Sequence, residues 1–222
     1  MESHRVKIIS IKEVTHDVKS FRLEKPAGYQ FTPGQATEVS IHKEGWEDER
    51  RPFTFTSLND DAWLEFTIKR YTDHNGVTNQ LHQLSVGDEL IVRDVWGAIE
   101  YKGPGYFIAG GAGITPFIAI FRQLHKEKKA GSETLFFSNK TTKDVIYEEE
   151  FKSILGNSAH FILTKDKRPG YETGYIDKKF LEKNITDFSK HFYICGPDKM
   201  ISDINTSLIE LGAKPDVVVF EK

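Results

Sequence analysis

The chain has 222 residues and a formal net charge of −3, so it lacks the basic excess that binding to a nucleic-acid phosphate backbone requires. Its 38% hydrophobic and 12% aromatic content is typical of a folded globular protein and excludes a disordered chain. Its single cysteine, Cys195, excludes an internal disulfide, an iron–sulfur cluster and a cysteine-rich zinc site, and favours a reducing compartment.

Six segments in the first hundred residues are rich in β-branched and aromatic residues, and several alternate apolar with polar positions. Glycine, proline, asparagine and aspartate residues between them predict turns. The predicted strands cover residues 6–14, 18–25, 36–43, 53–58, 63–71 and 89–97, with one short helix over residues 79–84. This spacing is typical of an antiparallel barrel or sandwich, and we expect a six-stranded antiparallel β-barrel.

The pattern changes after Tyr101, where residues 102–105 form a natural linker. Predicted strands at residues 106–110, 133–139, 159–166, 191–196 and 216–220 then alternate with predicted helices at residues 117–130, 145–155, 177–185 and 198–212. Such alternation indicates βαβ units and a doubly wound, mainly parallel sheet. We therefore expect two domains, a β-barrel over residues 1–101 and an α/β domain over residues 102–222.

The sequence also bears on location and on metals. The N-terminus lacks the apolar core of a signal peptide, and no uninterrupted apolar run reaches the roughly 18 residues of a membrane-spanning helix. We therefore expect a cytoplasmic protein without membrane insertion. The eight histidines have no metal-ligand spacing, so no metal site is expected.

The first motif with chemical potential is the segment from Arg51 to Ser57. Side chains alternate along a strand, so Arg51 and Phe53 point to one face. Arginine offers a fork of donors for a phosphate, Phe53 offers a flat ring for a planar cofactor, and Thr54 adds a hydroxyl. Taken alone, the segment is more typical of a core aromatic beside a surface arginine.

The second motif is the run from Gly76 to Asn79, which leads into the predicted short helix. Unpaired backbone N–H groups at the start of a helix can bind an anion. Taken alone, the run is more typical of a loop with an ordinary Thr or Asn N-cap.

The third motif, from Gly110 to Pro116, follows a predicted strand and precedes a helix, which is where doubly wound folds bind dinucleotides. Glycines allow the backbone to approach a pyrophosphate, and Pro116 suits the first helical turn. The run is not the usual G-x-G-x-x-G fingerprint. We favour a ligand-binding loop over a plain turn, because three glycines exceed what a turn needs.

The fourth motif is Cys195-Gly196-Pro197 at the end of another predicted strand. Parallel sheets place ligands at the carboxyl ends of their strands. A lone cysteine is also commonly a small buried hydrophobic residue, and the two interpretations are evenly balanced.

Four motifs in this order, across the whole chain, resemble the ferredoxin–NADP reductase family, which includes flavodoxin reductases and the microsomal cytochrome reductases. The resemblance implies an enzyme, a flavoprotein that transfers hydride from NADPH or NADH to bound FAD. FMN is a less favoured flavin. Electrons would then pass to a separate acceptor, such as the small electron carriers flavodoxin or ferredoxin.

The resemblance also implies roles for individual residues. Arg51 would bind the flavin phosphate, Phe53 would pack against the flavin ring, and Thr54 would bond near its hydride-accepting nitrogen. Cys195 would lie beside the nicotinamide carbon that gives up hydride, so Thr54 and Cys195 are the expected catalytic residues. The full set of expected cofactor-binding residues is Arg51, Pro52, Phe53, Thr54, Ile68, Lys69, Gly76, Val77, Thr78, Asn79, Gly110, Gly111, Gly113, Ile114, Thr115, Pro116, Ser138, Lys140, Cys195, Gly196 and Pro197.

The choice between NADPH and NADH stays open. Ser138 and Lys140 follow the second strand of the α/β domain, where a hydroxyl and a cation could hold the extra ribose phosphate of NADPH, and the acid expected for NAD is missing there. A solvated loop is an equally good interpretation, so the sequence favours NADPH only weakly.

Several departures from the family pattern leave alternatives open. The family aromatic is more often Tyr than Phe53, and its hydroxyl is usually Ser, not Thr54. Near the C-terminus, Phe220 and Glu221 could cover the flavin or serve the nicotinamide, although a core residue and a frayed end are somewhat favoured. The competing functions are a non-catalytic nucleotide- or flavin-binding sensor and a reductase subunit of a multicomponent oxygenase.

Overall fold

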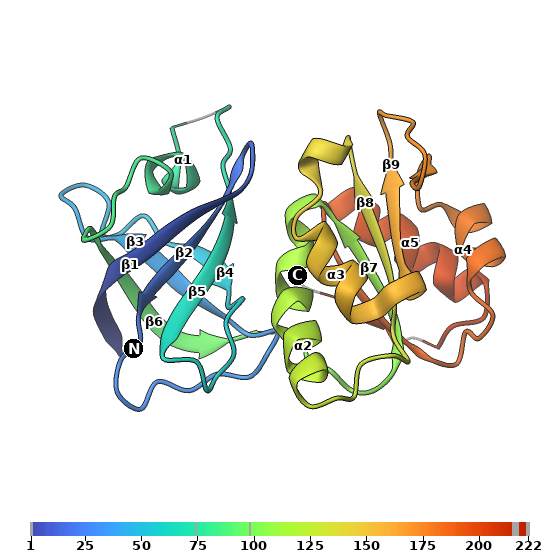
Figure 1. Ribbon diagram of the computed structural model, residues 1–222, viewed down its shortest axis with the longest axis horizontal. Coiled ribbons are helices and arrows are strands. Elements are labelled where there is room, and N and C mark those ends of the chain that lie inside the picture. Colours follow the sequence, from blue (N-terminus) through green and yellow to red (C-terminus); the bar gives the residue numbers. More distant parts are fainter. Residues whose placement is uncertain (1, 74, 98, 215–217, 221–222) are drawn as a thin grey trace. The chain divides into compact units, whose positions relative to one another are not determined.

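The computed structural model describes residues 2–73, 75–97, 99–214 and 218–220, the last three without their side chains. The chain divides into two compact units, residues 1–97 and 98–222, and each is described by itself (Figure 1). Both this division and the boundary expected after Tyr101 lie between strands β6 (Glu89–Trp96) and β7 (Gly105–Gly110). Within the described residues, every helix is too short or too polar to cross a bilayer.

The first unit is a closed antiparallel sheet. Its strands are β1 Ser3–Thr15, β2 Val18–Glu24, β3 Ala36–Ile41, β4 Arg51–Thr54, β5 Trp63–Lys69 and β6. They run in the order β4-β3-β6-β1-β2-β5, and a bridge between Phe55 and Phe66 joins the two outer strands. The expected six-stranded antiparallel β-barrel is therefore confirmed.

Alternating residues of the barrel strands fill its interior, and the rings of Phe31, Phe55 and Phe66 lie within contact of one another. Helix α1 (Val77–Leu81) adds Val77 and Leu81 to this core. The helix begins two residues before the predicted Asn79, because the backbone N–H groups of Asn79 and Gln80 already bond the Gly76 carbonyl.

The second unit is a parallel sheet of β7, β8 (Thr134–Asn139), β9 (Ala159–Leu163), β10 (Glu172–Thr173), β11 (His191–Cys195) and β12 (Val218–Phe220). The order is β10-β9-β8-β7-β11-β12. Four helices connect the strands: α2 Thr115–Lys126, α3 Glu148–Leu155, α4 Lys178–Asn184 and α5 Asp198–Glu210. Only β10 was not expected from the sequence, since two residues are too short to show a pattern.

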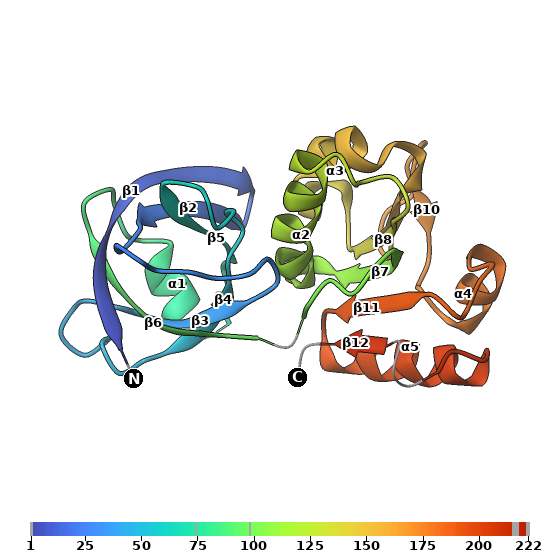
Figure 2. The same cartoon turned by 90° about the horizontal axis from the view of Figure 1, so that it is seen from below.

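Helices cover both faces of this sheet, as Figure 2 shows for α2 and α3 on one side and α5 on the other. Neighbouring residues of β8 make the division clear. The Phe137 ring packs against Phe151 of α3, whereas the Phe136 ring packs against Phe180 of α4. The expected doubly wound α/β fold is therefore confirmed.

Two predicted helices are shorter than their apolar patterns. Helix α2 ends at Lys126, because Lys128 adopts a positive φ of 57° and the N–H of Lys129 returns to the Leu124 carbonyl. Helix α3 begins at Glu148 because Tyr147, with a φ of 50°, separates it from a one-turn 3-10 helix at Thr142–Asp144.

Candidate cofactor-binding sites

Strand β4 carries the first expected site. Arg51 and Pro52 are exposed, Phe53 is half-buried against the barrel core, and Thr54 is buried. The Phe53 ring centroid lies 6.3 Å from that of Phe66, so the ring leans on the core while one side stays accessible. The strand thus presents, in sequence, a cation, a flat ring and a hydroxyl, and the Thr54 hydroxyl has no hydrogen-bond partner among the described residues.

The Arg51 guanidinium contacts two nearby residues of the chain, Arg50 and Glu49. Its Nη1 donates to the Arg50 carbonyl at 2.6 Å, and its Nη2 lies 3.9 Å from the Glu49 carboxylate. Its side chain is 50% exposed. Such a group can turn towards a phosphate at little cost, because it gives up only a weak surface ion pair.

A buried polar cluster follows strand β4, and sequence reasoning missed it. The hydroxyl of Thr56 donates to the Glu65 carboxylate at 3.0 Å and lies 3.2 Å from the Thr67 hydroxyl. Arg22 donates to the same carboxylate at 2.9 Å. The cluster fixes the chain just after Thr54, since a buried carboxylate is stable only when its oxygens are bonded. The available sequence signal was the alternation of hydroxyl and acidic residues on facing strands.

The end of strand β5 holds Ile68 and Lys69, two of the expected cofactor-binding residues. The Ile68 side chain is buried in the barrel core, and its carbonyl lies 2.9 Å from Nε2 of His82. A carbonyl only accepts, so Nε2 carries the proton. The Lys69 ammonium lies 3.0 Å from the Asp17 carboxylate. Burial alone would raise the pKa of Asp17, but the hydrogen bond and charge of Lys69 outweigh it and lower the pKa.

The run from Gly76 to Asn79 forms the start of helix α1. Val77 is a core residue, so it serves the fold. The Thr78 hydroxyl accepts from the backbone N–H of Tyr71 at 3.4 Å, and the Asn79 side chain accepts from Arg70 Nε at 2.9 Å. These contacts bring the turn beside the end of β5, so two separate expected segments become neighbours.

In the second unit, β7 ends at Gly110 and a 3-10 helix, η1 (Gly111–Ile114), leads into α2. Ile114 is buried, and the Thr115 hydroxyl donates to the Ala112 carbonyl at 3.1 Å. We call residues 110–116 the glycine loop. It stands at the carboxyl edge of the parallel sheet, as the sequence predicted for a dinucleotide loop.

The glycine loop lies against the Cys195-Gly196-Pro197 turn. A Cβ on Gly113 would lie 2.3 Å from the Cys195 carbonyl oxygen, and a Cβ on Gly110 would lie 3.0 Å from the Pro197 ring. Any larger residue would push the two segments apart. The structure therefore brings together the third and fourth motifs, and Cys195, 7% exposed, ends strand β11 there.

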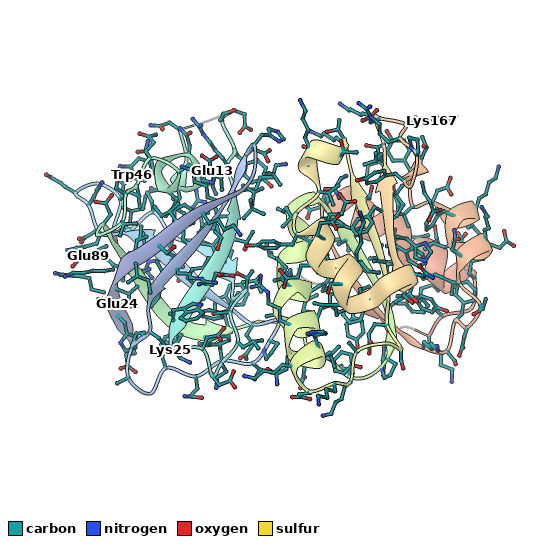
Figure 3. All side chains as sticks on the ribbon, viewed as in Figure 1. Glu13, Glu24, Lys25, Trp46, Glu89 and Lys167 are labelled. Carbon is teal, nitrogen blue, oxygen red and sulfur yellow. The ribbon has the colours of Figure 1, made fainter. Side chains whose placement is uncertain are left out.

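Ser138 and Lys140 also lie at this edge. Ser138 is the Cα partner of Gly110 on β7, and Lys140 is exposed with no side-chain partner among the described residues. The Lys140 carbonyl accepts from the N–H of Lys165, so the ends of β8 and β9 stay together. Beyond β9, Lys167 and Arg168 are exposed, and Figure 3 shows Lys167 on the loop that follows the strand.

Lys140, Lys165, Lys167 and Arg168 together form a cationic edge. Asp166 lies among them, and a hydrogen bond from Arg168 at 3.1 Å lowers its pKa. The sequence run Lys165 to Arg168 was the signal that could have added these residues to Ser138 and Lys140.

The two residues whose role the sequence left open, Phe220 and Glu221, lie near the C-terminus. The backbone of Phe220 pairs with Ile194 of β11. Glu221 lies outside the residues that the structure describes.

The residues present fit the two expected cofactors. The half-exposed Arg51 and the half-buried Phe53 suit a phosphate and a planar ring. The cradle at Gly110 and Gly113, which a Cβ would fill, suits a backbone that approaches a pyrophosphate. At the same edge, the buried side chain of Asn139 has neither of its polar atoms bonded.

Two family models match nearly the whole chain between them. The oxidoreductase FAD-binding domain model matches residues 5–101, and the oxidoreductase NAD-binding domain model matches residues 107–206.

Among curated proteins, the chain is 26% identical to the reductase component of propane 2-monooxygenase from Rhodococcus jostii (strain RHA1), over 98% of this chain and 63% of that protein. It is 28% identical to NADH-cytochrome b5 reductase 2 from Mycosarcoma maydis, over 88% of this chain and 62% of that protein. The chain thus spans less than two thirds of the length of these relatives.

Among solved structures, a ferredoxin NADP+ reductase from Neisseria gonorrhoeae with bound FAD and NADP superposes with a TM-score of 0.86. The two chains are 19% identical, and the match covers 100% of this chain and 98% of the other. At this level of identity, the match shows that the two chains share a fold.

Proposed function

Since the chain belongs to the ferredoxin reductase-type oxidoreductases, with an FAD-binding domain followed by a NAD-binding domain, we propose that it moves electrons from NADPH or NADH through FAD to a separate acceptor. The observation that carries the proposal is the contact between the glycine loop and the Cys195 turn at the carboxyl edge of the sheet. We take residues 1–101 as the flavin-binding domain and residues 102–222 as the NAD(P)-binding domain.

In the barrel, Arg51 holds the flavin phosphate through a charge-assisted hydrogen bond, and Phe53 packs on the ring. Thr54 places its unpartnered hydroxyl near the ring nitrogen that accepts hydride. The backbone of Ile68 and Lys69 lines the polar edge of the ring, and the turn from Gly76 to Asn79 holds the pyrophosphate. The bond from His82 to the Ile68 carbonyl supports this edge from behind.

In the second unit, the glycine loop cradles the pyrophosphate of the nicotinamide dinucleotide, and Thr115 follows at the first turn of α2. Cys195 positions the nicotinamide and does not attack it. Its thiol ends a buried strand, so it can set the depth at which the ring lies.

Bound flavin would supply the two-electron chemistry that amino-acid side chains lack. The contribution of this chain is therefore placement. On the first unit, Phe53 and Thr54 orient the flavin ring, and on the second unit Cys195 orients the nicotinamide. Defined orientation is worth several orders of magnitude in rate when it replaces random encounter.

We propose NADPH as the favoured donor. The cationic edge, with Lys140 at the end of β8 and Arg168 beyond β9, offers several positive charges for a ribose phosphate. The solved neighbour holds NADP, which supports the same choice, whereas one curated relative is named for NADH.

The acceptor is proposed to be a small electron-carrier protein such as flavodoxin or ferredoxin. A second candidate is the reductase subunit of a multicomponent oxygenase, which the name of the Rhodococcus relative favours. A non-catalytic sensor is the third. A cytoplasmic location stays a proposal that rests on the single cysteine.

The experiment is a visible spectrum of the purified protein, followed by separate additions of NADPH and NADH without oxygen. We expect a yellow protein that bleaches, faster with NADPH. A yellow protein that bleaches with neither nucleotide would contradict the electron transfer and favour the sensor. A colourless protein that takes up neither FAD nor FMN would contradict the flavin site.

A further inference from the structure

The side chain of Asn139 is buried without a partner. The residue is 5% exposed, and neither its Nδ2 nor its Oδ1 has a hydrogen-bond partner among the described residues. Its backbone carbonyl, by contrast, accepts from both the N–H and the hydroxyl of Thr164, at 2.9 and 3.3 Å. A buried polar group left unbonded is destabilising, so the free protein carries a local penalty here.

Asn139 lies beside the glycine loop. It is the last residue of β8, and its neighbour Ser138 is the Cα partner of Gly110. The next residues along these two parallel strands, Asn139 at the end of β8 and Gly111 just beyond β7, therefore lie side by side. The 3-10 helix η1, which begins at Gly111, contacts β8.

The carboxamide points to the side of the sheet that α2 and α3 cover. Side chains alternate along a strand, so Asn139 faces the same side as Phe137, which packs on Phe151 of α3. Phe121 of α2 packs on the same Phe151 ring. Helices that follow parallel strands begin at the carboxyl edge of the sheet, so the carboxamide lies near the start of α2.

One position of the glycine loop, Gly111, borders open space. Gly111 has a φ of 53°, and a Cβ built on it would meet nothing within 4 Å. Gly113, in contrast, is pressed against Cys195. The backbone at Gly111 therefore borders open space, whereas Gly110 and Gly113 on either side of it are packed against Pro197 and Cys195.

We propose that Asn139 is a positioning residue for the dinucleotide, acting through the glycine loop. When the pyrophosphate binds, the peptide groups around Gly111 turn towards it, and the carboxamide of Asn139 gains the partners that it lacks in the free protein. The bound state then no longer carries the cost of an unbonded carboxamide, and this difference strengthens dinucleotide binding. Direct contact with the ligand is excluded for the carboxamide as it stands, because both polar atoms are shielded from solvent. The inference rests on the proposed function.

The test is Asn139→Leu, which keeps the volume and removes the polar atoms, in the FAD-loaded protein. Its unfolding temperature without nucleotide should equal or exceed that of the wild type, because an apolar group replaces an unsatisfied one. Calorimetric Kd values for ADP-ribose, NADP+ and NAD+ should rise by about tenfold, while the flavin reduction rate at saturating NADPH or NADH stays unchanged.

The matched control is Asn184→Leu, since the Asn184 side chain donates to the Phe180 carbonyl at 2.9 Å. It should lower the unfolding temperature and leave the Kd values unchanged.

Two results would overturn the inference. Unchanged Kd values in Asn139→Leu would remove the link to the dinucleotide. A lower unfolding temperature without nucleotide would mean that the carboxamide already has a partner, such as a buried water, in the free protein. Wild-type protein that binds none of the three nucleotides would instead contradict the proposed function, and the inference with it.

Discussion

Thr54 is a buried residue whose hydroxyl has no hydrogen-bond partner among the described residues, and it lies on a strand that also exposes Arg51 and Pro52. In the proposed function, the flavin ring supplies that partner. The hydroxyl then orients the ring and adds little to its affinity.

We therefore expect Thr54→Ala to retain FAD and to slow flavin reduction by NADPH about 10- to 100-fold, because a misplaced ring loses orientation. Stopped-flow absorbance without oxygen measures this rate. Thr32→Ala, a change at an exposed loop position, is the control and should reduce at the wild-type rate. A Thr54→Ala protein as fast as wild type would remove the role assigned to Thr54.

Arg51 differs from Thr54 in that its proposed role is affinity. Arg51→Ala should raise the Kd for FAD about tenfold or more, because a charge-assisted bond to phosphate is lost. Fluorescence titration of flavin-free protein measures this Kd. Arg5→Ala removes another exposed arginine of the barrel, 3.7 Å from Glu89, and should bind FAD normally. Equal flavin affinity in both variants would contradict the phosphate role of Arg51.

At the scale of elements, His82 joins the end of α1 to strand β5. Its Nε2–H donates to the Ile68 carbonyl at 2.9 Å. Burial lowers the pKa of His82 below its ordinary value of 6.5, although the carbonyl opposes the shift. The folded protein therefore holds His82 neutral at a pH where the unfolded chain already takes up a proton.

This difference predicts a pH dependence of stability. Unfolding takes up a proton between pH 6.5 and the lower folded pKa, so the contribution of His82 is full above pH 6.5 and is lost as the pH falls through that window. The lowered pKa of Asp17 causes a separate loss only below its ordinary 3.8. Urea unfolding at about pH 7.5 and about pH 5.5 should therefore show a smaller loss in His82→Gln than in wild type.

Glutamine keeps a donor for the Ile68 carbonyl but does not titrate. The comparison therefore isolates the effect that protonation of His82 has on stability. His125→Gln, at an exposed position of α2, should keep the wild-type pH dependence. If His82→Gln lost stability as steeply as wild type, another group would be responsible.

At the scale of the whole molecule, each unit has its own hydrophobic core. One core centres on Phe55 and Phe66 in the barrel, and the other on Phe136 and Phe192 in the α/β unit. Because the proposed FAD and dinucleotide sites lie on different units, each ligand should stabilise mainly the unit that binds it.

The three tryptophans, Trp46, Trp63 and Trp96, all belong to the first unit. Tryptophan fluorescence therefore reports barrel unfolding, whereas helical circular dichroism reports mainly the second unit. Saturating FAD should raise the unfolding midpoint measured by fluorescence, and saturating ADP-ribose should raise the midpoint measured by circular dichroism. A ligand present at a hundred times its Kd adds about 2.7 kcal/mol to the free energy of unfolding of the unit that binds it. Coincident midpoints that move together with either ligand would contradict this separation.

The sequence by itself determined the architecture and the family. Apolar residues at every second position predicted the strands of the barrel. Predicted strands that alternate with predicted helices indicated the doubly wound sheet. Both predictions succeed because the local pattern of apolar residues decides which face of each element is buried. Apart from the missed two-residue strand β10, the errors of prediction fell at element ends. Tyr147 and Lys128 take positive φ values that their residue types do not signal, so α3 starts late and α2 stops early.

Only the tertiary structure decided which distant residues meet. Gly113 and Cys195 touch because β7 and β11 are neighbours in the sheet, and strand order is not written in any local pattern. The same holds for the Thr56–Glu65 cluster and for the unpartnered carboxamide of Asn139. Whether a polar group is bonded depends on everything packed around it, which the sequence of one segment does not contain.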